Sequence, residues 1–250
     1  MPRYIKLRET PSTNTYMHPL AGALKHATVI YTYRQTSGRG QTGNSWESED
    51  GMNLTFSMLL KPTSLEASRQ FALSEAVSLA IIDVVEPLVP PGLSVKWPND
   101  IYHDNKKLAG LLIENSLRGK LVEWSIAGVG LNVNQERFLS PAPNPVSIKQ
   151  LSGKDNDTDE LLHRVCEAID RRFGMLHDSE GIHQLHADYL AHLFRNDGRP
   201  HVFSLPDGER FAATIKTVQP DGQLVLTLDD GSTHTFAFKQ VQHCINDYML

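Results

Sequence analysis

The chain has 250 residues, of which 40% are hydrophobic and 21% are charged, and its formal net charge is −5. These values are typical of a globular protein with one large domain, or of one large and one small domain. The acidic balance argues against a nucleic-acid-binding surface that extends over the whole molecule, because such surfaces are basic.

The N-terminal residues, the apolar runs and the cysteines indicate in which cellular compartment the protein resides. The first residues lack the apolar segment of a secretory signal, and no uncharged apolar run approaches the roughly 18 residues of a membrane span. The longest candidate, residues 71–85, contains Glu75 and Asp83. Cys166 and Cys244 have neither CxxC nor zinc-ligand spacing, which favours free thiols in a reducing compartment. We therefore expect a cytoplasmic protein that does not bind a membrane.

The first half of the chain alternates between strands and helices. Polar N-cap side chains predict a brief helix at 12–17, and apolar residues at helical spacing predict a helix with one apolar face over 65–85. A polar turn at 103–105 lies between two apolar runs and suggests a hairpin. β-Branched or alternating runs predict strands at 4–7, 28–33, 52–60, 94–97, 101–102, 108–113 and 121–133.

The second half changes character after residue 194. Two helices are predicted at 159–176 and 182–194. The tail then has Asp-Gly turn signals that end at residues 198, 208, 222 and 231, with strands predicted at 214–218, 224–228 and 234–238. This spacing is typical of a small β-barrel or sandwich. We therefore predict an α+β domain over 1–195 and an all-β domain over 196–250.

A glycine-rich loop spans residues 35–46. Gly38, Gly40 and Gly43 permit positive φ and close backbone approach, so that successive N–H groups can converge on an anion. The spacing fits neither a P-loop nor a dinucleotide fingerprint, and a plain mobile turn is the alternative. Arg39 and Trp46 favour a ligand site instead, because they suit phosphate pairing and base stacking.

A second segment, residues 96–100, reads Lys-Trp-Pro-Asn-Asp. Pro98 removes a backbone donor where a strand ends, and its rigidity would fix Asn99 and Asp100 at the rim of the sheet. The alternative is an ordinary turn, which Asn-Asp after proline often begins. Beyond the predicted hairpin turn, Lys107 could return to face Asp100 beside an apolar strand, where desolvation strengthens its field.

Several segments resemble, in order and spacing, the motifs of biotin protein ligases, which attach biotin to carboxylases. The resemblance covers about residues 10–134, and the β-rich tail is similar to the family's SH3-like C-terminal domain. It implies a mixed β-sheet catalytic domain with flanking helices and a small all-β SH3-like barrel. The matching segments are Ser12-Thr13-Asn14, Gln35 with Gly38-Arg39-Gly40, Lys96-Trp97-Pro98-Asn99-Asp100, Lys107-Leu108-Ala109-Gly110 and Gly128-Val129-Gly130-Leu131-Asn132-Val133-Asn134.

The resemblance implies roles for the matching residues. Lys107, Arg39 and Asp100 would be catalytic: Lys107 would bridge the biotin carboxylate and the ATP α-phosphate, and Asp100 would orient the acceptor lysine. Biotin would be bound by Ser12, Thr13, Asn14, Gln35, Gly38, Arg39, Gly40, Lys107 and Gly110. The adenylate would be bound by Arg39, Gln41, Asn44, Trp46, Asn99, Lys107 and Asn132. Relatives often carry arginine at positions 41 and 44, so here the adenylate would be held by fewer cations.

The implied activity is that of an ATP-dependent ligase. It would form biotinyl-5′-AMP and transfer biotin to a lysine of a biotin carboxyl carrier protein or domain, with Mg²⁺ bound mainly through the ATP phosphates. No protein metal site is expected, and His183 and His186 are interpreted as solvated side chains. The chain begins almost at the first motif, which leaves no room for the DNA-binding domain of some relatives, so no DNA is expected. A homodimer is possible.

Three rival functions stay open. A lipoate–protein ligase would share the fold, but its Arg-Arg and Gly-Gly-Gly motifs do not occur in this sequence. A non-catalytic biotin or nucleotide sensor would not need both Lys107 and Asp100. The β-rich tail could instead lead an interaction module, yet its acidic residues disfavour nucleic acid, and closure over the nucleotide site or docking of the acceptor is the more ordinary role. These residues are Asp207, Glu209, Asp221, Asp229 and Asp230.

Overall fold

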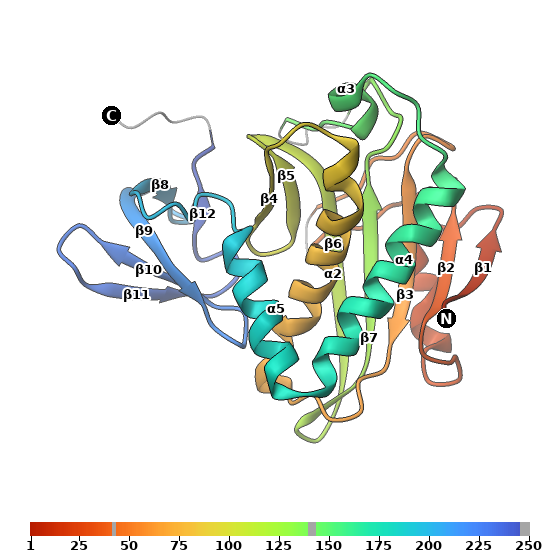
Figure 1. Cartoon of the computed structure of the whole chain (residues 1–250), viewed down its shortest axis with the longest axis horizontal. Coiled ribbons are helices and arrows are strands. Elements are labelled where there is room, and N and C mark those ends of the chain that lie inside the picture. The colour runs from red at the N-terminus through yellow and green to blue at the C-terminus, as the bar shows by residue number, and fades with distance from the viewer. Residues whose placement is uncertain (42–43, 140–143, 246–250) are drawn as a thin grey trace.

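The computed structural model describes residues 1–41, 44–139 and 144–245. Its larger sheet has the strand order β1-β2-β3-β7-β6-β5-β4 (Figure 1). β1 and β2 are parallel, and all other neighbouring strands are antiparallel. The strands are β1 (Arg3–Leu7), β2 (Thr28–Thr32), β3 (Leu54–Leu60), β4 (Leu93–Lys96), β5 (Asp100–His103), β6 (Lys106–Arg118) and β7 (Leu121–Leu131).

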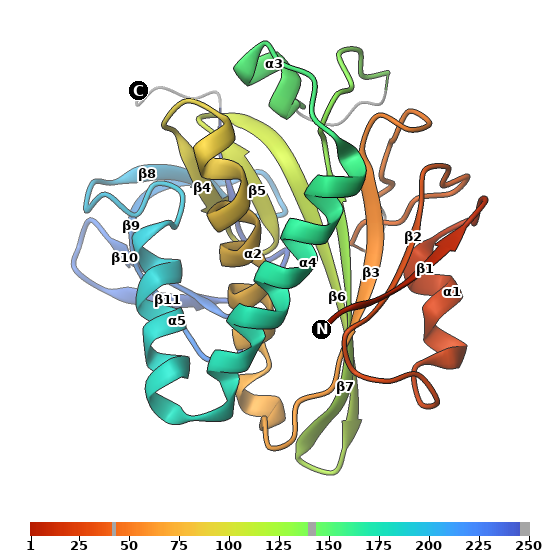
Figure 2. The same ribbon diagram turned by 45° about the vertical axis from the view of Figure 1, so that its right-hand side comes forward.

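Helices cover both faces of this sheet unequally. α2 and α4 lie across one face, with α5 beside α2 (Figures 1 and 2). The short α1 packs on the opposite face, where Met17 forms a separate small cluster with Ile30 and Ile126. The helices are α1 (Thr13–Met17), α2 (Phe71–Val85), α3 (Ile148–Ser152), α4 (Thr158–Gly174) and α5 (Ser179–Ala191). The face that carries only α1 stays partly open, and it holds the site described below.

The helix predicted over 65–85 begins only at Phe71. Before it, the carbonyl of Leu65 accepts from the Val122 N–H at 2.9 Å, and the Ala67 N–H donates to the Lys120 carbonyl at 2.8 Å. These bonds tie Leu65 and Ala67 to the β6–β7 hairpin, so that only a short 3-10 turn at Ala67–Arg69 precedes α2. All residues of α2 except Ser74 and Asp83 are buried, because the helix lies between the sheet and the other helices. The prediction of a single apolar face is therefore wrong.

The last predicted helix, 182–194, is also shifted: α5 ends at Ala191. The chain then pairs with β4, since the Val95 N–H donates to the His192 carbonyl at 2.8 Å and the Phe194 N–H donates to the Val95 carbonyl at 2.9 Å. Apolar residues beyond Ala191 thus join the core through turns and one isolated bridge between Leu193 and Val95. Helical periodicity could not distinguish this from one more turn of helix.

The tail is an all-β unit, as predicted, and forms an antiparallel sheet with the order β11-β10-β9-β8-β12. Among the described residues the order is open, with β11 and β12 at its two ends. The strands are β8 (His201–Ser204), β9 (Arg210–Val218), β10 (Leu224–Leu228), β11 (Thr233–Phe236) and β12 (Gln242–His243). The chain therefore has the predicted α+β architecture, while a domain boundary between residues 195 and 196 stays a prediction.

The tail sheet packs against the end of the larger sheet that carries β4 (Figure 1). The indole Nε1–H of Trp97, which is buried, donates to the carbonyl of Gly222 at 2.8 Å. Phe238 contacts both Trp97 and Phe71, with ring centroids 5.5 and 6.3 Å apart. Gly222 has φ +93°, and a Cβ there would lie 2.6 Å from Phe71. The close approach of the two sheets therefore requires glycine at this turn.

Two predictions from composition can be compared with the structure. Cys166, which is buried, and Cys244, which is partly exposed, are both free thiols, as expected. Within residues 1–41, 44–139 and 144–245, we find no helix with the length and apolar character needed to cross a membrane.

Candidate active site

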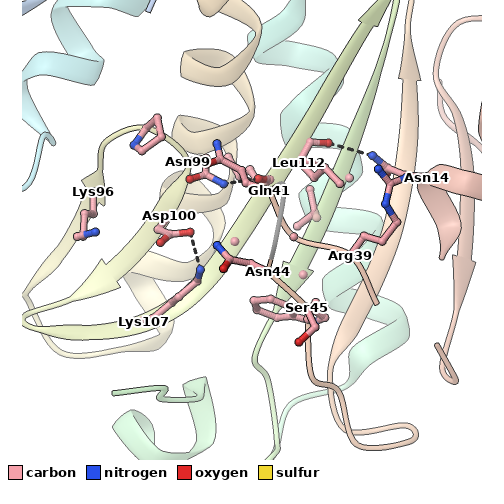
Figure 3. Close-up of a pocket in the computed structure, with 18 of the residues that line it drawn as sticks. Asn14, Arg39, Gln41, Asn44, Ser45, Lys96, Asn99, Asp100, Lys107 and Leu112 are labelled. Carbon is pink, nitrogen blue, oxygen red and sulfur yellow. Dashed lines mark hydrogen bonds and ion pairs between the residues drawn. The ribbon is translucent and has the colours of Figure 1, made fainter. Parts of the chain in front are cut away.

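A cavity of about 520 Å³ opens on the sheet face that carries α1, between the glycine loop and the tail sheet. Figure 3 shows part of its lining, with Lys96, Asp100 and Lys107 on one side and Asn14 and Arg39 on the other. The structure thus brings together segments that lie far apart in the sequence. The residues predicted from sequence that line it are Ser12, Thr13, Asn14, Gln35, Arg39, Gly40, Gln41, Asn44, Trp46, Asn99, Asp100, Lys107 and Gly110.

One row of residues crosses the sheet beneath this cavity. The strand register aligns Lys96, Asp100, Gly110, Gly130 and Thr55 on β4, β5, β6, β7 and β3. Directly paired residues of antiparallel strands point to the same face, so the row presents a cation, a carboxylate and then two bare positions. The charged groups are therefore held at one end of the cavity by the ladder itself.

Lys107 reaches this face because of a β-bulge. The register between β5 and β6 shifts so that Ile101 pairs with Ala109 and Tyr102 pairs with Lys107, which leaves Leu108 as the extra residue. In a regular strand, Lys107 and Gly110 would point to opposite faces. The bulge re-aims the lysine, and its Nζ lies 2.7 Å from Oδ1 of Asp100. The predicted approach of these two residues is confirmed (Figure 3).

Glycines form the floor of the cavity. Gly130 pairs with Gly110, and a Cβ on Gly130 would lie 2.6 Å from Cζ2 of Trp46. A Cβ on Gly128 would lie 2.8 Å from Cγ of Asn14. The alternation Gly128-Val129-Gly130 therefore keeps side chains off one face only, and the Trp46 ring and the Asn14 amide occupy the space. Trp46 thus rests directly on the sheet.

Several uncharged polar groups lie at the opposite end, beside α1. The Ser12 hydroxyl caps this helix by accepting from the Thr15 N–H at 3.5 Å, and the Thr13 N–H donates to Oε1 of Gln35 at 3.0 Å. The buried Ser57 hydroxyl contacts Oγ1 of Thr13 at 2.7 Å and Oδ1 of Asn14 at 2.5 Å. This network orients donors and acceptors at fixed positions, which suits recognition of a neutral polar ligand group.

The glycine loop forms a small hairpin of its own. Its backbone N–H groups at Gly40 and Trp46 donate to the carbonyls of Asn44 and Gly38, at 2.9 and 3.0 Å. These two N–H groups are bonded inside the loop in this conformation, and a cradle of N–H groups around an anion stays a prediction. Gly38 and Gly40, which permit a positive φ, do not adopt one in this structure. The third glycine of that prediction, Gly43, lies outside the described residues.

Arg39 is turned toward the polar end of the cavity. Its guanidinium donates to Oε1 of Glu114 at 3.2 Å and to Oγ1 of Thr15 at 3.1 Å. Glu114 also accepts from Nδ2 of Asn14 at 2.8 Å. A carboxylate thus holds both Arg39 and the Asn14 amide, and the guanidinium lies on the other side of the cavity from Lys107 (Figure 3).

Two residues assigned to the site by resemblance are not among the described residues that line the cavity, namely Gly38 and Asn132. A Cβ on Gly38 would lie 2.7 Å from Nε2 of Gln35, so this glycine allows the loop to approach a neighbouring side chain. Asn132 is buried and donates from Nδ2 to the Val146 carbonyl at 3.1 Å. Both therefore shape the surroundings of the cavity in this conformation.

The sequence reasoning missed several lining or supporting residues. Lys96 belongs to one of the matching motifs, but the sequence assigned it no role. Burial in this wall lowers the pKa of its ammonium, and the nearby Asp100 carboxylate opposes that change. Ser57 and Glu114 carry no local signal. The tail contributes further lining residues, which are Pro206, Lys239, Val241 and Gln242. The location of these residues at the cavity becomes clear only from the strand register and from the packing of the tail sheet.

His186 corrects another expectation, since it was interpreted as a solvated side chain. Its Nδ1 lies 2.8 Å from Oε1 of Glu75, which is buried within α2. The hydrogen bond to this carboxylate raises the pKa of His186. The pair joins α5 to α2, far along the chain from each other. His183, by contrast, is exposed as expected.

The architecture and cavity define a class of protein, and a family comparison agrees with them. The sequence model of the Biotin/lipoate A/B protein ligase family matches residues 7–132, about half of the chain. The chain therefore belongs to this family.

Two known proteins of this family are similar in sequence to the chain. The chain is 30% identical over 197 residues to a biotin–[acetyl-CoA-carboxylase] ligase of Paracoccus denitrificans, covering 76% of this chain and 80% of that protein. It is also 30% identical over 185 residues to the bifunctional ligase/repressor BirA of Bacillus subtilis, covering 73% of this chain. The chain spans about half the length of that Bacillus relative, with 53% covered.

A solved structure shows the same fold. A biotin protein ligase from Aquifex aeolicus in complex with biotin and ATP aligns with a TM-score of 0.78 and 23% identity. The alignment covers 97% of this chain and all of that chain. The likeness therefore includes the tail sheet as well as the larger sheet.

Proposed function

We propose that this protein is a biotin protein ligase. It activates the carboxylate of biotin with ATP, forms biotinyl-5′-AMP, and transfers biotin to a lysine of a biotin carboxyl carrier protein or domain. The observation that carries the proposal is the contact between Lys107 and Asp100, with 2.7 Å between Nζ and Oδ1, beside a glycine floor. The naming of the Paracoccus relative as a biotin–[acetyl-CoA-carboxylase] ligase supports the same substrate and acceptor.

Biotin binds with its ureido ring at the polar end and its carboxylate near Lys107. The Ser12, Thr13 and Gln35 groups beside α1 supply neutral hydrogen-bonding partners, which suit an uncharged urea. The bare floor at Gly128 and Gly130 leaves room for a flat ligand to lie against the sheet.

Adenylation needs cations that are already in position. The biotin carboxylate attacks the α-phosphate of ATP, pyrophosphate leaves, and two anions must approach each other. The Lys107 ammonium, fixed by the bulge, stabilises the negative charge on both. Arg39 is held by Glu114 at 3.2 Å in this conformation, so its contribution requires the loop to release that pair when the ligands bind.

Transfer needs a neutral amine. The acceptor lysine has an ordinary pKa of about 10.4, so it enters as an ammonium at neutral pH. Asp100, which is mostly buried, lies at the reaction end of the row and accepts a hydrogen bond from this group, orienting it and assisting loss of its proton. The amine then attacks the activated carbonyl and AMP leaves.

Mg²⁺ enters with the nucleotide in this proposal. Asp100 is the sole carboxylate among the described residues that line the cavity, and it is paired with Lys107. Within the described residues no group of three or more metal-binding side chains gathers anywhere. The residues present therefore suit an ion held by phosphate oxygens, which neutralises part of their charge.

The tail sheet covers the cavity and contributes to docking of the carrier protein. Its residues Pro206, Val241 and Gln242 line the cavity wall, which supports a role in closing over the nucleotide. The two free cysteines suit a reducing compartment, so we propose that the reaction takes place in the cytoplasm.

The direct test incubates the protein with biotin, MgATP and a biotin carboxyl carrier domain and detects labelled carrier with streptavidin. A parallel reaction replaces biotin with lipoate and detects lipoylated carrier with an antibody. Biotin-dependent labelling supports the proposal. Lipoate transfer without biotin transfer would identify the other branch of the family, and binding of biotin without any transfer would identify a sensor.

Asp100→Asn tests the transfer step separately. Single-turnover transfer from isolated biotinyl-AMP should fall about 10²-fold, because an amide can orient the amine but cannot accept its proton. Asp104→Asn is the matched control, since Asp104 is exposed on the β5–β6 turn. Equal transfer rates for the wild type and Asp100→Asn would remove Asp100 from the mechanism.

A further inference from the structure

We propose that Ser57 determines which ligand rings the polar end of the cavity accepts. Ser57 lies on β3, is buried, and is not among the described residues that line the cavity. It acts through Thr13, because it keeps the hydroxyl hydrogen of Thr13 turned inward, so that this hydroxyl faces the cavity only as an acceptor. The inference rests on the proposed function, in which the ligand is biotin and its ureido ring carries N–H donors.

The side-chain amide of Asn14 sets the direction of the hydrogen bonds. Its Nδ2 donates to the Leu112 carbonyl at 3.1 Å and to Oε2 of Glu114 at 2.8 Å. Both partners are acceptors, and the Glu114 carboxylate also pairs with Arg39 at 3.2 Å. Turning the amide over would place its oxygen against these two acceptors, and Asn14 is buried. Oδ1 of Asn14 is therefore fixed toward Ser57.

The Ser57 hydroxyl has a single hydrogen to share between two neighbours. Its Oγ lies 2.5 Å from Oδ1 of Asn14 and 2.7 Å from Oγ1 of Thr13. An amide oxygen cannot donate, so Ser57 donates to Asn14. The contact with Thr13 is then a hydrogen bond only if Thr13 donates to Ser57. The Thr13 hydrogen is thus used inside the protein, and the cavity, which Thr13 lines, meets its lone pairs.

The sheet keeps these three side chains together. Ser57 on β3 pairs with Gly128 on β7, so both positions face α1. A Cβ on Gly128 would lie 2.8 Å from Cγ of Asn14, so the bare position gives the amide its place beside Ser57. Ser57 is 0% exposed, Asn14 3% and Thr13 4%, which keeps water from replacing any of them. The direction of the hydrogen bonds is therefore a fixed property of this wall.

A buried group that can only accept discriminates between ligands. A ligand N–H placed against Thr13 gains a hydrogen bond, whereas a ligand atom with a lone pair there leaves both groups without a donor. A cyclic urea offers N–H groups, and the dithiolane ring of lipoate has none. Ser57 is thus a positioning residue that favours the urea, although it does not line the cavity itself.

The test uses the two carbamate analogues of biotin, in each of which oxygen replaces one ureido N–H. These analogues have nearly the shape of biotin, so a difference in affinity reports hydrogen bonding. Each is titrated calorimetrically into the protein without ATP. For the wild type, the analogue that lacks the N–H facing Thr13 should bind about 100-fold more weakly than biotin, because lone pairs then face each other.

Ser57→Ala should reduce this selectivity. The Thr13 hydroxyl loses its inner acceptor and can turn to donate to the carbamate oxygen, so the ratio of the two affinities should fall about tenfold. Biotin itself should lose less affinity than that. Ser125→Ala is the matched control. Ser125 is a buried serine on β7 whose hydroxyl meets no hydrogen-bond partner among the described residues, so the ratio should stay at the wild-type value.

Asn14→Leu tests the direction in the opposite sense. Without the amide oxygen, Ser57 has only Thr13 to donate to, and the Thr13 hydrogen then points into the cavity. The carbamate that the wild type rejects should now bind at least as tightly as biotin. A pocket that had merely loosened would instead lose affinity for all three ligands alike.

The outcomes separate this inference from the proposed function. If the wild type binds both carbamates as tightly as biotin, or if Ser57→Ala keeps the wild-type ratio, the role of Ser57 is overturned, while biotin labelling of the carrier domain by the wild type leaves the ligase function standing. If the ratio depends on Ser57 but no labelled carrier forms with MgATP, the role of Ser57 stands and the ligase function is overturned.

Discussion

The two sides of the cavity are built differently. On the side of β4, β5 and β6, Asp100 and Lys107 are fixed by the register of the strands and by a bulge. On the other side, the glycine loop is held by its own internal hydrogen bonds and by the contacts of Arg39 with Glu114 and Thr15. The proposed reacting charges thus belong to the rigid side, and the loop that we propose closes over the ligand belongs to the adjustable one.

This difference has a physical basis. Breaking one ladder bond in the middle of a sheet disturbs its neighbours, whereas a surface loop opens at low cost. The Trp46 ring lies over Gly130, in the space where a ligand would contact the floor, so binding requires this ring to move or to stack on the ligand. We therefore expect substitutions on the rigid side to lower the reaction rates. Substitutions in the loop should cause smaller changes, mainly in ligand affinity.

The largest effect is expected from Lys107→Ala. Adenylation should fall at least about 10²–10³-fold, because the fixed ammonium is lost where two anions meet. The measurement is biotin-dependent release of pyrophosphate from ATP, and biotin affinity should fall less. The fold should be kept, since the side chain lies at the cavity edge.

Lys106→Ala is the matched control. Lys106 is the preceding residue, is exposed, and pairs with His103 on the opposite face of the sheet. Its replacement should leave the rate unchanged. Similar losses in both variants would mean that the hairpin, and not the ammonium of Lys107, is required, and a normal rate for Lys107→Ala would remove this lysine from the mechanism.

The floor is tested by Gly130→Ala. The added Cβ would lie 2.6 Å from Cζ2 of Trp46, so the ring must be displaced. We expect the adenylation rate to fall about 10–100-fold, because a displaced ring shifts the ligand out of its reactive position. Stopped-flow quenching of Trp46 fluorescence by biotin should change as well. Gly174→Ala is the control because no atom lies within 4 Å of its added Cβ, and equal rates for both variants would contradict a packed floor.

Much of this site could be predicted because its parts are local. The return of Lys107 toward Asp100 follows from a short hairpin, and the N-cap of α1 follows from Ser12. The glycine alternation at 128–130 was visible in the sequence, although its meaning as a floor depends on which strands flank it. Spacing is informative where the chain folds back on itself within a few residues.

The features of the site that could not be predicted from the sequence depend on contacts between residues far apart in the chain. Ser57 meets Asn14 only because β3 pairs with β7 below α1, and Glu75 meets His186 across two helices. The position of Lys239 in the cavity wall depends on the docking of the tail sheet. The backbone conformation of the glycine loop could not be predicted either, because it is set by cross-loop hydrogen bonds that composition does not specify.

Trp97→Phe tests whether the rigid side depends on the tail sheet. The substitution keeps the ring contact but removes the Nε1–H, which leaves the Gly222 carbonyl buried without its donor. We expect a loss of about 1–3 kcal/mol in the free energy of unfolding and a higher KM for ATP. Denaturant unfolding and initial rates measure the two. Trp124→Phe, at a half-buried indole on β7, should lower the free energy of unfolding by less. Equal losses in the two variants would mean that the rigid side does not depend on the hydrogen bond to the tail sheet.

The smallest effect is expected from Gln41→Arg, which adds a cation to the adjustable side. Gln41 lines the cavity and is partly exposed, so a new pair with the adenylate phosphate is screened by solvent and should contribute below about 1 kcal/mol. Dissociation of biotinyl-AMP should therefore slow by up to roughly fivefold, while the rate of adenylation stays nearly constant. Gln41→Met separates charge from side-chain length. If both variants release the adenylate at the wild-type rate, the loop does not contact the phosphate; if Gln41→Arg instead accelerates adenylation strongly, the loop belongs with the reacting charges and the distinction between the two sides fails.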